Sequence, residues 1–173
     1  PAASILTKQL QPQNFTIYTN EGWQPAASAL KLIPDTNGDV ETKVFNNTVL
    51  ANGRNALANC LANQIGDSFT FYIDRMLYGS NGVDSGVPKF VSTSRTGLFG
   101  ATVANKPVIA TIDPTITSQV TFTSVLSFDD ANTTLNEIAL RMNNEDLYSM
   151  ATFPDLNKTN SVQITFNWRI SFV

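Results

Sequence analysis

A strict alternation of apolar and polar side chains near the end of the chain constrains the fold more than any other feature. The apolar positions are Val162, Ile164, Phe166, Trp168, Ile170 and Phe172. The positions between them are Ser161, Gln163, Thr165, Asn167, Arg169 and Ser171. This period of two predicts a β-strand with one buried face. At roughly 3.3 Å per residue the strand would span on the order of 40 Å, so it needs partner strands from earlier in the chain or from another chain.

Earlier segments supply such strands. We predict them at residues 69–78, 107–112, 119–128, 135–142 and 147–153, separated by turn-forming residues. Residues 52–65 predict one helix, which Asn52 would cap and Gly66 would end. Its apolar stripe is Leu57, Cys60, Leu61 and Ile65, and we expect Cys60 to be a small buried residue on this helix.

These elements predict a mainly β protein, an antiparallel β-sandwich of jelly-roll type with one helix and an extended N-terminal arm. Prolines at positions 12, 25 and 34 interrupt the apolar groups of residues 1–43, which we expect to form the arm, with short strands held partly by another molecule. Residues 44–173 would form a single β-sandwich domain. Removing the arm should then leave that domain folded.

The composition excludes several functional classes. The chain has no histidine and one cysteine, which removes the commonest general base, the usual nucleophile pairs and most zinc sites. A net charge of −3 without a basic stripe argues against nucleic-acid binding. We found no signal peptide and no apolar segment long enough to span a membrane, so we expect synthesis in the cytoplasm and no membrane partner. We predict no enzymatic activity and no cofactor.

The acidic residues were considered as catalytic or metal-binding groups. Asp129 and Asp130 fit solvated turn carboxylates better than a glycosidase pair. Glu137 lies inside a strand, where we expect a structural ion pair with Arg141 or Arg169. The segment 35–41 resembles a calcium loop, but a plain Asn-Gly hairpin turn explains it more simply, and we predict no metal site.

Apolar residues outside the regular elements are candidates for a partner interface. Residues 79–106 form a long segment without a regular period, and loops of this length are usually functional or fixed by a partner. We also expect Trp168 in the core and Trp23 free to bury in a partner. The predicted interface residues are Phe15, Trp23, Leu30, Ile33, Phe90, Arg95, Leu98 and Phe99, with Arg95 contacting an acidic surface.

Several segments resemble structural proteins of tailed bacteriophages. The resemblance covers roughly residues 50–173 and is carried by residues 53–58, 78–82, 136–140 and 146–153, by Lys158-Thr159, and by the closing alternating strand. Such proteins include capsid cement or decoration proteins with jelly-roll-like sandwiches, and components of the neck, collar and tail.

The resemblance implies a virion structural protein. In the first form of this prediction, the protein is a cement or decoration protein on the outside of the bacteriophage capsid. It would bind the major capsid protein and act as a homo-oligomer, either a dimer or a trimer. The alternative is a neck, collar, tail or fibre component, with host-glycan binding through exposed aromatic residues. In the first form the protein, made in the host cytoplasm, would localise to the capsid surface of the virion.

Overall fold

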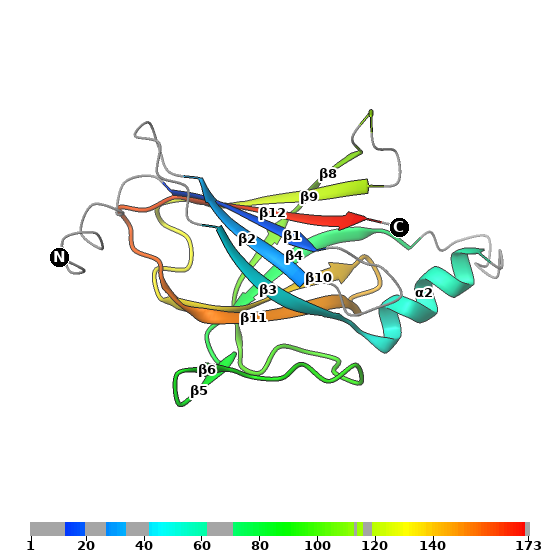
Figure 1. Cartoon of the computed structure of the whole chain (residues 1–173), viewed down its shortest axis with the longest axis horizontal. Helices are drawn as coiled ribbons and strands as arrows, with labels where there is room; N and C mark the ends of the chain where they lie inside the picture. The colour runs from blue at the N-terminus through cyan, green and yellow to red at the C-terminus, as the bar shows by residue number, and fades with distance from the viewer. Residues whose placement is uncertain are drawn as a thin grey trace. The chain divides into compact units, whose positions relative to one another are not determined.

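The computed structural model describes residues 13–19, 27–33, 42–61, 71–112, 114–115 and 119–171. It divides the chain into two compact units. Unit 1 takes its residues from Pro1–Asn46, Ile109–Thr134 and Leu156–Val173, and unit 2 consists of Asn47–Val108 and Leu135–Asp155. The described residues are mainly β with one helix, which confirms the prediction of a mainly β protein with one helix (Figure 1).

Unit 1 contains one sheet with the strand order β3-β2-β1-β12-β9-β8. The strands are β1 (Gln13–Thr19), β2 (Ala27–Ile33), the first part of β3 (Thr42–Val49), β8 (Ile109–Ile112), β9 (Gln119–Leu126) and β12 (Ile164–Ser171). The predicted alternation is confirmed in β12, where Ile164, Phe166 and Trp168 are fully buried and the residues between them are half-exposed. β12 pairs with β9 in antiparallel register and with β1 in parallel register.

The N-terminal segments differ from the expected arm. β1 lies between β12 and β2, and β2 pairs with residues 42–46 of β3. β9 pairs with one edge of β12, and β1 pairs with the other edge. The described part of residues 1–43 therefore belongs to a sheet of its own chain. Residues 44–173 contribute to both compact units, and the first segment of unit 1 ends at Asn46.

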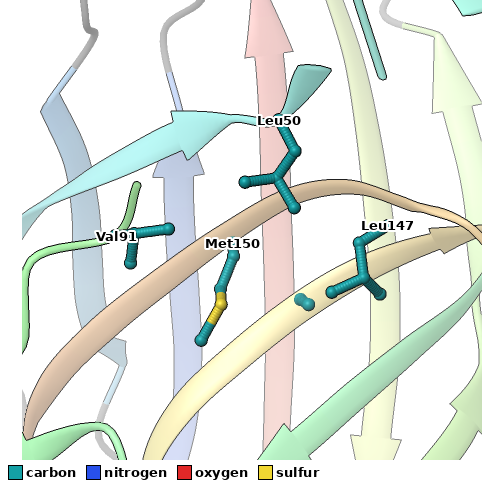
Figure 2. Close-up of a cluster of buried hydrophobic side chains, with 5 residues drawn as sticks. Leu50, Val91, Leu147 and Met150 are labelled. Atoms are coloured by element: carbon teal, nitrogen blue, oxygen red, sulfur yellow. The ribbon is translucent and has the colours of Figure 1, made fainter. Parts of the chain in front are cut away.

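Unit 2 contains a second sheet with the order β7-β4-β10-β11-β3. Its elements are α2 (Ala51–Leu61), β4 (Ile73–Gly79), β5 (Val83–Asp84), β6 (Val87–Pro88), β7 (Thr102–Pro107), β10 (Thr134–Met142), β11 (Leu147–Asn157) and the end of β3. β10 has neighbours on both sides and is buried on both faces from Leu135 to Leu140. A compact apolar cluster packs on this sheet and comprises Leu50, Val91, Ala139, Leu147 and Met150 (Figure 2).

Two strands of unit 2 differ from the sequence prediction. β7 was expected to be irregular, but it pairs with β4 as an edge strand. β11 continues through Pro154, where a loop was expected. The pairing of β11 with β3 ends at Ala151, so Pro154 lies beyond that ladder.

Helix α2 packs through a different face from the predicted one. Gly53 and Ala56 are buried, whereas Cys60 is exposed, so the prediction of a buried cysteine is wrong. A side chain at position 53 would meet the backbone of Tyr148, and the small residues therefore let the helix approach β11 closely. The helix begins at Ala51, so Asn52 lies inside the first turn and does not cap it.

Candidate interaction surface

The segment between β4 and β7, residues 80–101, is the longest irregular stretch in the described part of the chain, and we call it the β4–β7 loop. A small hairpin lies inside it, formed by β5 and β6. Ser85 and Gly86 connect these strands with φ angles of 50° and 81°. Positive φ at both central residues is the signature of a type I′ turn, which matches the twist of paired strands.

Glu137 of β10 fixes both ends of the β4–β7 loop. Its side chain is fully buried. One carboxylate oxygen accepts hydrogen bonds from the backbone N–H groups of Asn81 and Gly100, both at 3.1 Å. The other accepts a hydrogen bond of 2.6 Å from the N–H of Phe99. A buried carboxylate needs such donors, and here the loop backbone supplies them.

The neighbouring Asn136 adds a further anchor. Its Oδ1 accepts a 2.6 Å hydrogen bond from the N–H of Gly82, while its Nδ2 donates to Asp155 at 2.9 Å. A Cβ atom at position 82 would collide with the backbone of Asn136, so glycine is required for this close approach. Residues 78–82 and 136–140, two of the segments that carry the phage resemblance, therefore contact each other.

The inner side of the loop belongs to the core of unit 2. Val91 is part of the apolar cluster (Figure 2). Leu98 and Phe99 pack against this cluster. Thr152 of β11 also donates its hydroxyl to the carbonyl of Lys89 at 2.8 Å. Leu98 and Phe99 were predicted as partner anchors, but they already contact apolar side chains of their own unit.

Two cations lie over the ring of Phe99. The guanidinium carbon of Arg95 is 3.7 Å from the ring centroid, and the Lys89 nitrogen is 5.2 Å away. Arg95 also donates to the carbonyls of Gly97 at 3.0 Å and Leu98 at 2.7 Å. Much of the hydrogen-bonding capacity of Arg95, which was expected to contact a partner, thus serves the shape of the loop.

The outer side of the loop presents apolar side chains to solvent. Phe90 is 87% exposed and Val87 is 64% exposed. Val87 belongs to β6 and Phe90 follows it closely. The Lys89 N–H donates to the Gly82 carbonyl at 2.7 Å and so closes the base of the β5–β6 hairpin. Among the predicted interface residues whose side chains are described, Phe90 is the most exposed.

The N-terminal members of the predicted interface belong to strands of unit 1 or lie outside the described residues. Phe15 is the strand partner of Phe166, and Leu30 and Ile33 lie in β2. Trp23 and the calcium-like segment 35–41 lie outside the described residues. The predicted interface residues with described side chains, Phe90, Arg95, Leu98 and Phe99, all belong to the β4–β7 loop.

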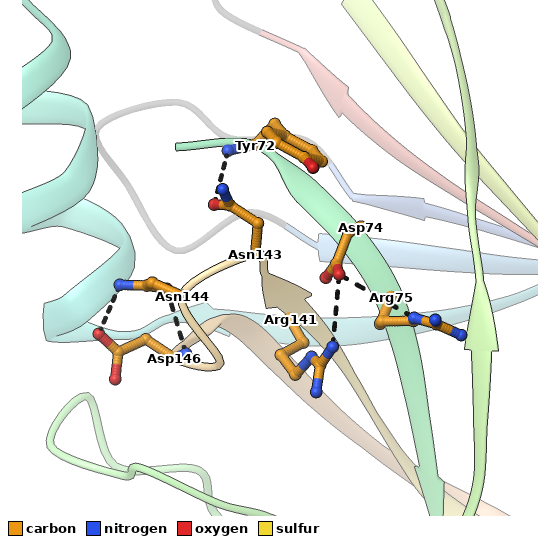
Figure 3. Close-up of polar contacts among 7 residues, drawn as sticks. All are labelled: Tyr72, Asp74, Arg75, Arg141, Asn143, Asn144 and Asp146. Atoms are coloured by element: carbon orange, nitrogen blue, oxygen red, sulfur yellow. Dashed lines mark hydrogen bonds and ion pairs between the residues drawn. The ribbon is translucent and has the colours of Figure 1, made fainter. Parts of the chain in front are cut away.

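Several charged residues in the described part of the chain make structural contacts. The prediction that Glu137 forms an ion pair is wrong, because its carboxylate accepts hydrogen bonds from backbone N–H groups. Arg141, one of the two expected partners, contacts Asp74 at 3.3 Å (Figure 3). Asp130 accepts hydrogen bonds from the N–H and hydroxyl of Ser127. No three acidic, cysteine or histidine side chains in the described ranges gather to hold a metal ion.

The arrangement is suited to binding, because the loop backbone is fixed by hydrogen bonds and presents the exposed apolar side chains of Val87 and Phe90. Within the described residues, no helix has the length and hydrophobicity to cross a bilayer. Comparisons with protein-family models, with curated proteins and with solved structures gave no match to this chain.

Proposed function

We propose that the protein is a virion structural protein of a tailed bacteriophage, a decoration or cement protein that binds the capsid through the β4–β7 loop. The observation that carries this proposal is Phe90, a large apolar side chain 87% exposed on a loop whose backbone is held by buried hydrogen bonds. The phage resemblance of residues 50–173 supports the choice of partner, the major capsid protein.

A fixed loop favours binding because little conformational entropy remains to be lost. Glu137, Asn136 and Thr152 hold the loop through hydrogen bonds to its backbone. Such preorganisation lowers the ordering cost that a flexible loop would meet on association. The exposed hairpin therefore offers a ready-made contact.

One such contact contributes little binding free energy, but several simultaneous contacts together can give stable binding. Burying a phenylalanine side chain contributes about 1.5–3 kcal/mol. A homo-oligomer that engages several capsid subunits at once gains from effective concentration at every further contact. We therefore propose that the protein acts as a dimer or trimer, on the capsid surface of the virion.

The test is binding of purified protein to phage heads that lack it. We expect Phe90→Ser to reduce the affinity for heads at least tenfold, which corresponds to a loss of about 1.4 kcal/mol. The variant should fold normally because the side chain is in solvent. Sedimentation of heads with labelled protein measures the bound fraction.

Ile109→Thr is the matched control. Ile109 is 72% exposed in β8 of unit 1, so this variant removes exposed apolar surface without touching the β4–β7 loop. Its binding should equal that of the native protein. If Phe90→Ser bound heads normally, the loop would not be the capsid contact. If the native protein bound purified tails and not heads, the decoration role would be replaced by a neck or tail role.

A further inference from the structure

A polar cavity of about 160 Å³ opens in unit 2 beside helix α2, and no residue of the β4–β7 loop lines it. Helix α2 forms one wall, the β10–β11 hairpin another, and the segment leading into β4 a third. The lining residues are Asn52, Asn55, Ala56, Asn59, Phe71, Asn144 and Asp146. Four of these seven side chains are asparagine amides, each of which can donate and accept hydrogen bonds.

Helical spacing brings three of the amides to the cavity. Asn52, Asn55 and Asn59 are separated by three and four residues, so they lie along one face of α2. This face is adjacent to the small residues Gly53 and Ala56, through which the helix packs. The sequence 51–61 therefore has two functions, close packing through its small residues and a row of amides beside them.

The opposite wall is ordered by hydrogen bonds. The carboxylate of Asp146 accepts bonds from Asn52 Nδ2 at 3.0 Å and from Asn144 Nδ2 at 2.9 Å. The N–H of Asp146 donates to Asn144 Oδ1 at 3.2 Å. Figure 3 shows Asn144 and Asp146 at the hairpin, facing α2. These three side chains are therefore positioned before any ligand arrives.

The remaining amides are available to a ligand. Asn55 and Asn59 are exposed, and neither has a side-chain hydrogen bond within the described part of the chain. Each can donate and accept at once. Phe71, half-buried, contributes an apolar side chain to the same lining.

We propose that this cavity binds one neutral sugar ring. A sugar hydroxyl both donates and accepts, as a side-chain amide does, and neighbouring hydroxyls match the paired groups of an asparagine. The C–H face of a sugar ring is apolar and suits Phe71. Phosphorylated or acidic ligands fit poorly, because the lining includes a carboxylate and no lysine or arginine.

The size of the cavity limits the ligand to a single ring. Sites for drug-sized molecules occupy about 300–1,000 Å³, whereas this cavity has about 160 Å³. The ring would be a free monosaccharide or the terminal residue of a glycan. This site is separate from the β4–β7 loop and holds whether or not the protein decorates a capsid.

Ligand-detected NMR tests the proposal. The probes are glucose, galactose, mannose and N-acetylglucosamine, each as the free sugar and as the methyl glycoside, with adenosine monophosphate as an anionic, aromatic competitor. We expect at least one sugar to bind with millimolar or tighter affinity. Binding of the glycosides alone would indicate a glycan terminus, and equal binding of the free sugar would indicate a monosaccharide site.

Asn55→Ala/Asn59→Ala should reduce this affinity at least tenfold. Alanine is a better helix former than asparagine, so the variant should remain folded, which circular dichroism checks. The matched control is Asn105→Ala/Asn160→Ala, which removes two exposed amides outside the cavity. The proposal is overturned if no sugar binds, if only adenosine monophosphate binds, or if the cavity variant binds as the control does.

Discussion

At the scale of single residues, Glu137 has the largest structural influence in unit 2. It is a charged side chain with no exposed surface, and its three hydrogen bonds all come from backbone N–H groups of one loop. Sequence alone suggested an ionic partner for it, because backbone donors carry no sequence signal. Glu137 therefore links the central strand of the sheet to the surface that we propose for partner binding.

Glu137→Gln should destabilise the protein by about 1–3 kcal/mol. The amide group of glutamine would face at least one N–H donor and leave it buried without an acceptor. Urea unfolding measures the change. Glu145→Gln is the control, since Glu145 is exposed in the β10–β11 turn and its neutralisation changes the net charge equally. Equal stability of the two variants would mean that the loop does not depend on the carboxylate.

Lys158 offers a test that depends on pH. It is only 2% exposed, and its ammonium donates to Phe128 O, Asn132 Oδ1 and Thr159 O at 3.0–3.2 Å. Burial lowers the pKa of Lys158 from its ordinary value of 10.5, and Asp130 and Asp129 oppose that shift. Between the lowered pKa and 10.5 the unfolded chain binds more protons, so the contribution of Lys158 to stability rises with pH in that window.

The measurement compares the native protein with Lys158→Met in urea unfolding at several pH values from about 8 to 10.5. The variant should be less stable throughout because three acceptors, partly shielded from water, lose their donor. The difference in the free energy of unfolding should grow as the pH rises. A difference that shrank with pH would show that the native state raises this pKa.

At the scale of elements, the strands with a clear apolar periodicity could be predicted from the sequence, and those without it could not. β12 could be predicted because its alternating residues are buried on one face only. β7 could not, because it is an edge strand with mostly exposed or half-exposed side chains and no periodic signal. In α2 the packing face consists of glycine and alanine, which an apolar stripe does not identify, and this is why Cys60 was assigned to the wrong face.

The candidate surface shows the same limit. Its location in an unpatterned loop could be predicted from length and composition. Which side chains face outward could not, because Phe90 and Phe99 are the same residue type in the same loop. Phe99 differs from the exposed Phe90 by its hydrogen bond to Glu137, its contacts with the apolar cluster and the two cations over its ring.

At the scale of the whole molecule, each compact unit is assembled from segments far apart in the sequence. In unit 1 the N-terminal strand β1 lies between β2 and β12, so it is an interior strand of that sheet. Removing an interior strand leaves its neighbours with unpaired N–H and C=O groups. The N-terminal segment is therefore part of the folded unit, which changes the expected effect of truncation.

Deletion of residues 1–41 should unfold unit 1, whereas a dispensable arm would leave it intact. Trp168, fully buried in β12, reports on this unit, and the deletion also removes Trp23, the other tryptophan of the chain. The fluorescence emission of Trp168 should shift to the red in the truncated protein because water reaches its indole ring. Trp23→Phe in the full chain is the control and should keep the emission of a buried tryptophan. Identical spectra for the two proteins, with equal urea midpoints, would show that β12 folds without β1.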